Sequence, residues 1–407
     1  MKFNKWTLGL AAVGAVSLAS VAQAEEKMLL GSQANLTSTT ISGYVSASAA
    51  WDFGNDADAA NTRGYSYSAG KGDGFNLDVV DISLEKALDE SEWASGYKAE
   101  LWFGPDAQGI GSQLAAATGD VAVKQAYVAL RTPIGNGIDW KIGVFDTIIG
   151  YESSNAGDNP NYSRSWGYSI EPTQHTGILG SYRFCDVVSA SFGIANTWDA
   201  PINGRDTHDT TKTWLASVAL TAPESFGFLH GGTLYAGIVD GTLGGAAGAG
   251  ADTRTSYYLG ASIPTPIEGL KAGVAFDYLV MNNRPGNNNG NSSALAGYLS
   301  MRATEKLTLN ARVDYIRLGG DGLVTQAAPP PANPAYTGNN VLANAAFVGS
   351  DEFIATTITA DYQLWKDVIA RAELRWDTDL GQNGGSHFRS GLDNNEFTLA
   401  ANVIYKF

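Results

Sequence analysis

The chain has 407 residues, with 48 glycines, 10 tryptophans, 18 tyrosines and one cysteine. Its formal net charge of −15 at pH 7 argues against the basic stripes of a nucleic-acid-binding protein, so no nucleic acid is expected as a partner. A single cysteine excludes an internal disulfide framework.

The first segment, residues 1–24, has the features of a signal peptide for Sec export. Lys2 and Lys5 precede an apolar stretch, and Ala22-Gln23-Ala24 has the small-x-small form of a cleavage site. Residues 25–39 are expected to be a short periplasmic segment, followed by a membrane domain over 40–407. Nothing downstream approaches the roughly 18 consecutive apolar residues of a spanning helix, so any membrane domain must be built from strands.

Alternation of apolar and polar residues with a period of two recurs through the rest of the chain and predicts about sixteen strands. Because 213–263 alternates poorly, fourteen to eighteen strands are compatible with the pattern. The predicted strands lie near 40–53, 74–86, 93–104, 121–131, 138–146, 174–184, 187–198, 213–221, 232–240, 254–263, 269–280, 292–303, 306–317, 352–364, 367–377 and 396–407.

The connections alternate between long and short along the chain. Long ones such as 147–173 and 318–351 interleave with short ones such as 304–305 and 365–366. This order is typical of an even-stranded barrel in the outer membrane. We therefore predict an all-β, transmembrane, antiparallel up-and-down β-barrel with long external loops and short periplasmic turns.

The two faces of the predicted strands differ in chemistry. In 367–377 an uncharged face alternates with a face carrying Arg371, Glu373, Arg375 and Asp377. In a soluble sandwich the apolar face would pack on a second sheet. In a barrel it meets outer-membrane lipid and lipopolysaccharide while the charged face lines water, which is the interpretation we favour.

The last strand ends on an aromatic side chain of its apolar face. Tyr405 and Phe407 are expected to join an aromatic girdle at the periplasmic interface. A terminal phenylalanine on such a strand resembles the signal by which the barrel-assembly machinery recognises outer-membrane proteins for insertion.

One stretch, GVFDTIIGYESSNAGDNPNYSRSWGYSIEPTQHTGILGSY, carries a family resemblance. It resembles the OmpL-like putative beta-barrel porin family, a group of bacterial outer-membrane proteins. The matching elements are Gly143–Phe145, Thr147–Glu152, Asn161–Ser165 and Pro172–Gly177. Ile148 departs from the family pattern, which has proline there. The resemblance implies a porin with no particular substrate.

The connection 147–173 is the third long one and is predicted to narrow the lumen, which in a sixteen-stranded barrel is too wide for side chains to fill. Part of this prediction is analogy with general porins. We hypothesise that acids near this loop face arginines of the wall across a constriction and create a transverse field. Alternatively, each arginine pairs along the wall with Asp314, Glu373 or Asp377. The hypothesised constriction residues are Glu152, Asp158, Arg164, Glu171, His175, Arg312, Arg371 and Arg375.

The predicted function is passive diffusion of small hydrophilic solutes and ions, with a mild cation preference. Two alternatives are a plugged outer-membrane anchor or adhesin and, less favoured, a barrel hydrolase using Ser163 and His175. Ser163 lacks the context of a nucleophile elbow. The histidines at 175, 208, 230 and 387 show no zinc spacing, so no metal or cofactor is expected. A homotrimer and a monomer are both compatible with the sequence.

Overall fold

The computed structural model describes residues 28–29, 38–53, 65–68, 71, 73–110, 121–198, 200, 202–205, 210–243, 253–282, 289–319, 351–381 and 394–407. The predicted signal peptide, 1–24, and most of the segment 25–39 lie outside these residues. Within the described part, no helix is long and apolar enough to cross a membrane.

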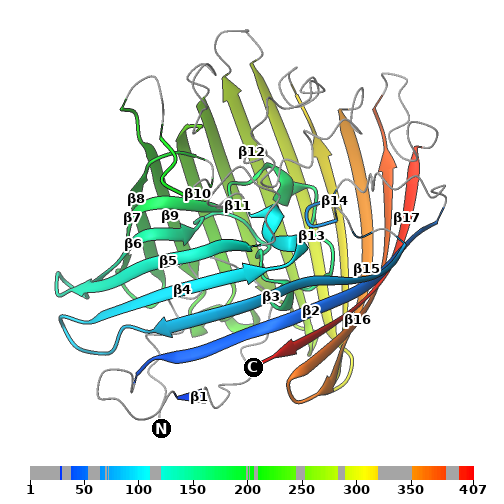
Figure 1. The fold of residues 1–407 in the computed structure, drawn as a ribbon, viewed down its shortest axis with the longest axis horizontal. Helices are drawn as coiled ribbons and strands as arrows, with labels where there is room; N and C mark the ends of the chain where they lie inside the picture. Colours follow the sequence, from blue (N-terminus) through cyan, green and yellow to red (C-terminus); the bar gives the residue numbers. More distant parts are fainter. Residues whose placement is uncertain are drawn as a thin grey trace.

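The described chain forms one antiparallel barrel (Figure 1). Each strand from β2 to β16 pairs with the next, and β17 pairs with β2 to close the barrel. Short 3-10 helices lie in the connections: η2 (Pro105–Gly109), η3 (Ala156–Asp158), η4 (Gly167–Ile170) and η5 (Glu224–Leu229). The strands are β1 (Met28–Leu29), β2 (Thr40–Phe53), β3 (Gly74–Lys86), β4 (Ser95–Phe103), β5 (Val121–Thr132), β6 (Ile138–Asp146), β7 (Gln174–Arg183), β8 (Val188–Ala195), β9 (Thr213–Thr221), β10 (Thr233–Thr242), β11 (Thr253–Pro264), β12 (Leu270–Asn282), β13 (Gly290–Arg302), β14 (Leu307–Arg317), β15 (Glu352–Trp365), β16 (Val368–Asp379) and β17 (Asn395–Lys406).

The sequence prediction of a sixteen-stranded barrel is confirmed for β2 to β17. The predicted ranges agree with the observed strands to within a few residues, including the poorly alternating region that forms β9 to β11. The two-residue strand β1 pairs with the start of β2, where Met28 lies opposite Ile41.

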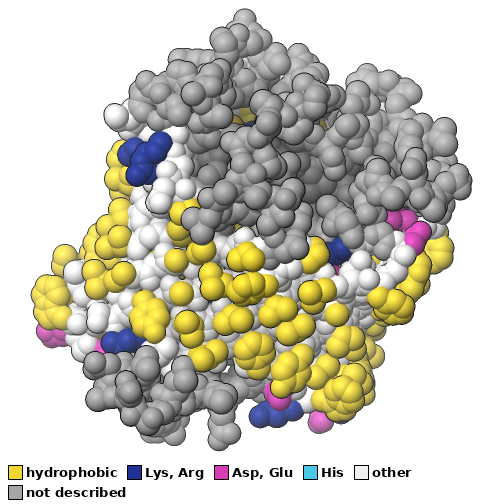
Figure 2. Space-filling model, viewed as in Figure 1, with side chains coloured by type: hydrophobic (Ala, Val, Ile, Leu, Met, Phe, Trp, Pro, Cys, Tyr) yellow, Lys and Arg dark blue, Asp and Glu magenta, His cyan; other side chains and the backbone are white. Residues whose placement is uncertain are grey.

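The faces of the strands follow the predicted alternation. On β16, Leu374 and Trp376 are exposed on the outer surface, while Arg375 and Asp377 are buried on the lumenal side. Figure 2 shows hydrophobic side chains spread over the part of the outer wall that is visible in this view. A large exposed apolar surface is unfavourable in water but suits the hydrocarbon region of a bilayer.

Aromatic pairs mark both ends of the closing strand. Trp376 and Phe397 stack at the end of the long loops, and Tyr405 and Phe407 stack at the end of the short turns. Phe407 also exchanges two backbone hydrogen bonds of 3.0 Å with Gly43 of β2. The last residue of the chain therefore takes part in closing the barrel.

Candidate pore constriction

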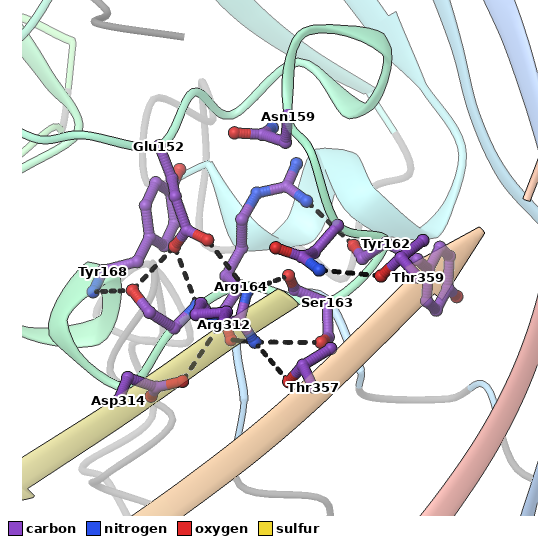
Figure 3. A network of polar contacts seen from close by, with 12 residues as sticks. Glu152, Asn159, Tyr162, Ser163, Arg164, Tyr168, Arg312, Asp314, Thr357 and Thr359 are labelled. Atoms are coloured by element: carbon purple, nitrogen blue, oxygen red, sulfur yellow. Dashed lines mark hydrogen bonds and ion pairs between the residues drawn. The ribbon is translucent and has the colours of Figure 1, made fainter. Parts of the chain in front are cut away.

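Residues 147–173, called here the inserted loop, leave the wall after β6 and return to it at β7. Between these points the loop contacts lumenal side chains of β12 to β16, far away in the sequence (Figures 1 and 3). The 3-10 helices η3 and η4 both belong to this loop. The inserted loop therefore lies inside the barrel.

The first part of the inserted loop is apolar and packs on an uncharged part of the lumenal wall. Ile148 and Ile149 are buried, and the hydroxyl of Tyr235 on β10 donates to the carbonyl of Ile148. The ring of Tyr151 stacks on Tyr298 of β13 at 4.1 Å between centroids. This apolar contact anchors the start of the loop, and sequence reasoning missed it because it concentrated on charged residues.

Arg312 of β14 is the centre of the polar contacts at the far wall (Figure 3). Its guanidinium lies 2.9 Å from Asp314 on its own strand and 2.9 Å from Glu152 of the loop. It also donates to the carbonyl oxygen of Ser163 at 2.7 Å and to the hydroxyl of Thr357 at 3.1 Å. With 0% exposure, Arg312 combines the wall pair and the loop contact that the sequence offered as alternatives.

The other two wall arginines bind backbone carbonyls of the loop. Arg375 pairs with Asp377 at 2.7 Å and donates to the carbonyl of Arg164 at 2.6 Å. Arg371 pairs with Asp361 at 2.8 Å and donates to the carbonyl of Ala156 at 2.7 Å. Each arginine thus neutralises a wall acid and holds the loop with its remaining N–H groups.

Acids of the wall accept hydrogen bonds from the loop backbone in return. Glu373 accepts from the N–H groups of Tyr162 at 2.6 Å and Ser163 at 3.0 Å. Trp166 donates its backbone N–H to Asp314 at 2.7 Å and its indole N–H to Asp377 at 2.9 Å. Since buried backbone groups need partners, this exchange lets an irregular loop lie inside the barrel. Sequence reasoning did not single out Trp166 or Tyr162.

The loop is also braced by its own side chains. Arg164 donates to the carbonyls of Ser153 at 2.9 Å and Ser154 at 2.8 Å. Glu152 accepts hydrogen bonds of 2.7 Å from both the backbone N–H and the hydroxyl of Ser165. These bonds draw the two halves of the loop together, which gives it a defined shape.

Glu171, near the end of the loop, is hydrogen-bonded to a second carboxyl group, that of Asp277 on β12. A hydrogen bond between two carboxyl groups requires a proton on one of them. Burial raises the pKa of Glu171 well above its ordinary value, and the neighbouring Asp277 raises it further. Burial and the neighbouring carboxyl group therefore favour the neutral form of Glu171 over a fixed negative charge.

Asp158 and His175 differ in exposure to solvent: Asp158 is exposed and His175 is buried. Asp158 at the tip of the loop is 42% exposed on its side chain and lies 3.8 Å from the ammonium of Lys406. His175 is buried in β7, and its Nε2 lies 3.1 Å from the hydroxyl of Thr147. Of the five hypothesised residues from this part of the chain, Asp158 is the one that retains an accessible charge.

Ser163 and His175, the two residues of the alternative hydrolase, are hydrogen-bonded to other side chains and not to each other. The hydroxyl of Ser163 accepts a hydrogen bond from Arg312 at 3.2 Å, and His175 contacts Thr147. Within the described residues, no group of three or more His, Cys, Asp or Glu side chains could hold a metal ion. His208 and His387 lie outside that part of the chain.

A closed sixteen-stranded barrel with an apolar outer wall, a charged lumen and a loop folded inside is the architecture of a bacterial outer-membrane porin. The sequence profile of the family "Putative beta-barrel porin-2, OmpL-like" matches residues 38–407, and the chain belongs to this family. The resemblance seen in the sequence is thereby confirmed, and the chain is a porin.

Solved porin and channel structures share the fold at low sequence identity. The anion-selective porin from Comamonas acidovorans has a TM-score of 0.60 and 12% identity, covering 91% of this chain and 99% of that one. The OmpF porin of Salmonella typhi, solved with daunomycin, has a TM-score of 0.55 and 12% identity, covering 91% and 97%. The DcaP channel of Acinetobacter baumannii has a TM-score of 0.54 and 12% identity, covering 91% of this chain and 97% of that one. No curated protein sequence matches the chain.

Proposed function

We propose that the inserted loop is the constriction of this porin and sets the size limit for passive diffusion of small hydrophilic solutes. The hydrogen bonds and ion pair that join Arg312 to Glu152, Ser163 and Arg164 carry this proposal, because they hold the loop within the lumen. A porin of this width needs such an obstacle in order to discriminate between solutes.

The hypothesised constriction residues divide into two roles. Arg312, Arg371 and Arg375 are buried and hold the shape of the loop, together with Glu152, Arg164, Glu171 and His175. Asp158 presents its carboxylate to solvent at the loop tip and contributes to the charge that a solute meets. With the chain's net charge of −15, a mild preference for cations is expected.

A plugged anchor or adhesin is the second candidate. Its support is the burial of the wall arginines, since Arg312 is 0% and Arg375 is 1% exposed beneath the loop. Single-channel conductance of the refolded protein in a planar bilayer separates the two functions. Discrete current steps from a folded, heat-modifiable barrel are expected for the porin, and their absence would leave the plugged anchor. Passive diffusion, the function proposed here, requires neither catalysis nor a cofactor.

We further propose that residues 1–24 direct export to the bacterial outer membrane and that the barrel-assembly machinery recognises the strand ending in Tyr405 and Phe407. Support comes from the exposed, stacked rings of these two residues. The outer wall then contacts outer-membrane lipid and lipopolysaccharide. A homotrimer is the proposed assembly, for which a trimeric form of a fold neighbour, OmpT of Vibrio cholerae, gives a precedent.

A further inference from the structure

Away from the wall arginines, the lumenal wall carries further charged side chains. These lie on β3 to β6, near the ends of the short turns. Glu85, Lys98, Tyr127 and Lys141 are all half-buried, whereas Glu100, deeper on the same wall, is fully buried. Lys98 retains 19% exposure of its side chain against 1% for Glu100. This wall is therefore accessible from the lumen.

Strand register places Glu85, Lys98 and Tyr127 in one row, and Lys141 next to it. Glu85 lies opposite Lys98, and Lys98 lies opposite Tyr127. Lys141 lies opposite Ala129, one lumenal position further along the wall. Adjacent strands are about 4.8 Å apart and two residues span about 7 Å along a strand, so the backbones of Glu85 and Lys141 are separated by roughly 16 Å, a distance that two long side chains shorten at their tips.

Most charges of this wall already have partners. Lys98 pairs with Glu100 at 2.7 Å, and Lys124 pairs with Glu100 at 3.2 Å and with Asp146 at 2.8 Å. Asp146 also accepts a hydrogen bond from Gln174 at 3.2 Å. These groups form a closed network that runs from β4 to β7.

Lys141 and Glu85 stay outside this network, as does Asp81 of β3, which is 5% exposed. Lys141 has no carboxylate of the described chain within 4.0 Å, and its ammonium lies 5.0 Å from the centre of the Tyr127 ring. The carboxylate of Glu85 has no cationic group of the described residues within 4.0 Å either. Asp146 attracts Lys141 more strongly than any other charge does, and Lys98 and Glu85 act on it more weakly. One half-buried ammonium and one half-buried carboxylate thus lie on the lumenal wall without an ion pair to any described residue.

We propose that Lys141 and Glu85 form a subsite for zwitterionic solutes, such as amino acids and short peptides. The carboxylate of the solute binds Lys141, and its ammonium binds Glu85. Tyr127 and the aliphatic part of Lys98 contact the solute between them. Small anions or cations would satisfy one of the two charges and leave the other unpaired, whereas a zwitterion satisfies both. This subsite rests on the proposed function, since its solute must enter the lumen.

The test uses single-channel recording of the full-length mature porin with glycylglycine as the probe. Two compounds of similar size serve as comparisons: the anion N-acetylglycine and the neutral N-acetylglycinamide. The variants are Lys141→Gln and Glu85→Gln. The control is Lys271→Gln, which removes an exposed lumenal lysine from β12, away from the proposed subsite.

Glycylglycine is expected to interrupt the current at a lower concentration than either comparison compound. Each variant should raise that concentration at least about threefold, in line with one partly screened ion pair, while Lys271→Gln should leave it unchanged. N-acetylglycine should respond to Lys141→Gln alone. Lys141→Arg and Glu85→Asp should retain binding, which distinguishes a lost subsite from a misfolded barrel.

Two results would overturn the inference, and they can be told apart. A conducting porin whose glycylglycine response is unchanged in both variants would refute the subsite and leave the proposed function intact. A folded wild-type barrel without any conductance would refute the proposed function, and the subsite with it.

Discussion

Replacing Arg312 with methionine is the most direct perturbation of the inserted loop. Methionine has a similar length but cannot donate a hydrogen bond, so the contacts to Glu152, Asp314, Ser163 and Thr357 are lost together. Two buried carboxylates then lack their cation. Removing one partner of a buried ion pair typically costs about 3–5 kcal/mol.

A cost of this size is large compared with the free energy that keeps a loop docked, because local openings of a protein need far less than global unfolding. The barrel itself keeps its hydrogen bonds between strands. We therefore expect Arg312→Met to release the loop without unfolding the barrel. Single-channel conductance should rise, and proteolysis within 147–173 should become faster.

Arg317→Met is the matched control, because Arg317 lies on the same strand but is 64% exposed and pairs with Glu352 at 3.4 Å. An exposed pair contributes at most about 1 kcal/mol, so conductance and proteolysis should stay at wild-type values. If Arg312→Met also behaved like the wild type in both assays, the role of Arg312 in holding the loop would be refuted.

Three further predictions concern the loop and the last strand. Because the pKa of Glu171 is raised, its hydrogen bond to Asp277 stabilises the docked loop at acidic pH and is lost as the pH rises through this raised pKa. Conductance should then increase on the alkaline side, and Glu171→Gln should abolish that pH dependence; an unchanged profile would contradict it. Gly273→Ala places a Cβ against the hydroxyl of a loop tyrosine and should increase conductance, whereas Gly297→Ala, whose Cβ makes only an ordinary contact of 4.0 Å with the carbonyl oxygen of Val313, should not. Equal conductance of the two variants would argue against close packing of the loop on β12. Removal of Phe407 should reduce the fraction of heat-modifiable barrel several-fold, measured by gel migration after expression; full assembly would refute its role in insertion.

The sequence by itself determined the barrel. Alternation with a period of two is a local property, because neighbouring residues of a strand point to opposite faces. Because one face of each strand contacts lipid and the other contacts water, apolar and polar residues alternate along the strands. The ranges of the strands, the lipid-facing side of Leu374 and Trp376, and the lumenal side of Arg375 and Asp377 could therefore be predicted.

Only the tertiary structure decided how the inserted loop meets the wall. Arg312 and Glu152 are 160 residues apart in the sequence and lie in contact because the barrel closes around the loop. The same closure determines which charges are paired, so that Lys124 forms two ion pairs while Lys141 and Glu85 form none with the described residues. Contacts between the inserted loop and distant strands depend on the path of the loop through the closed barrel, which no local pattern of residues encodes.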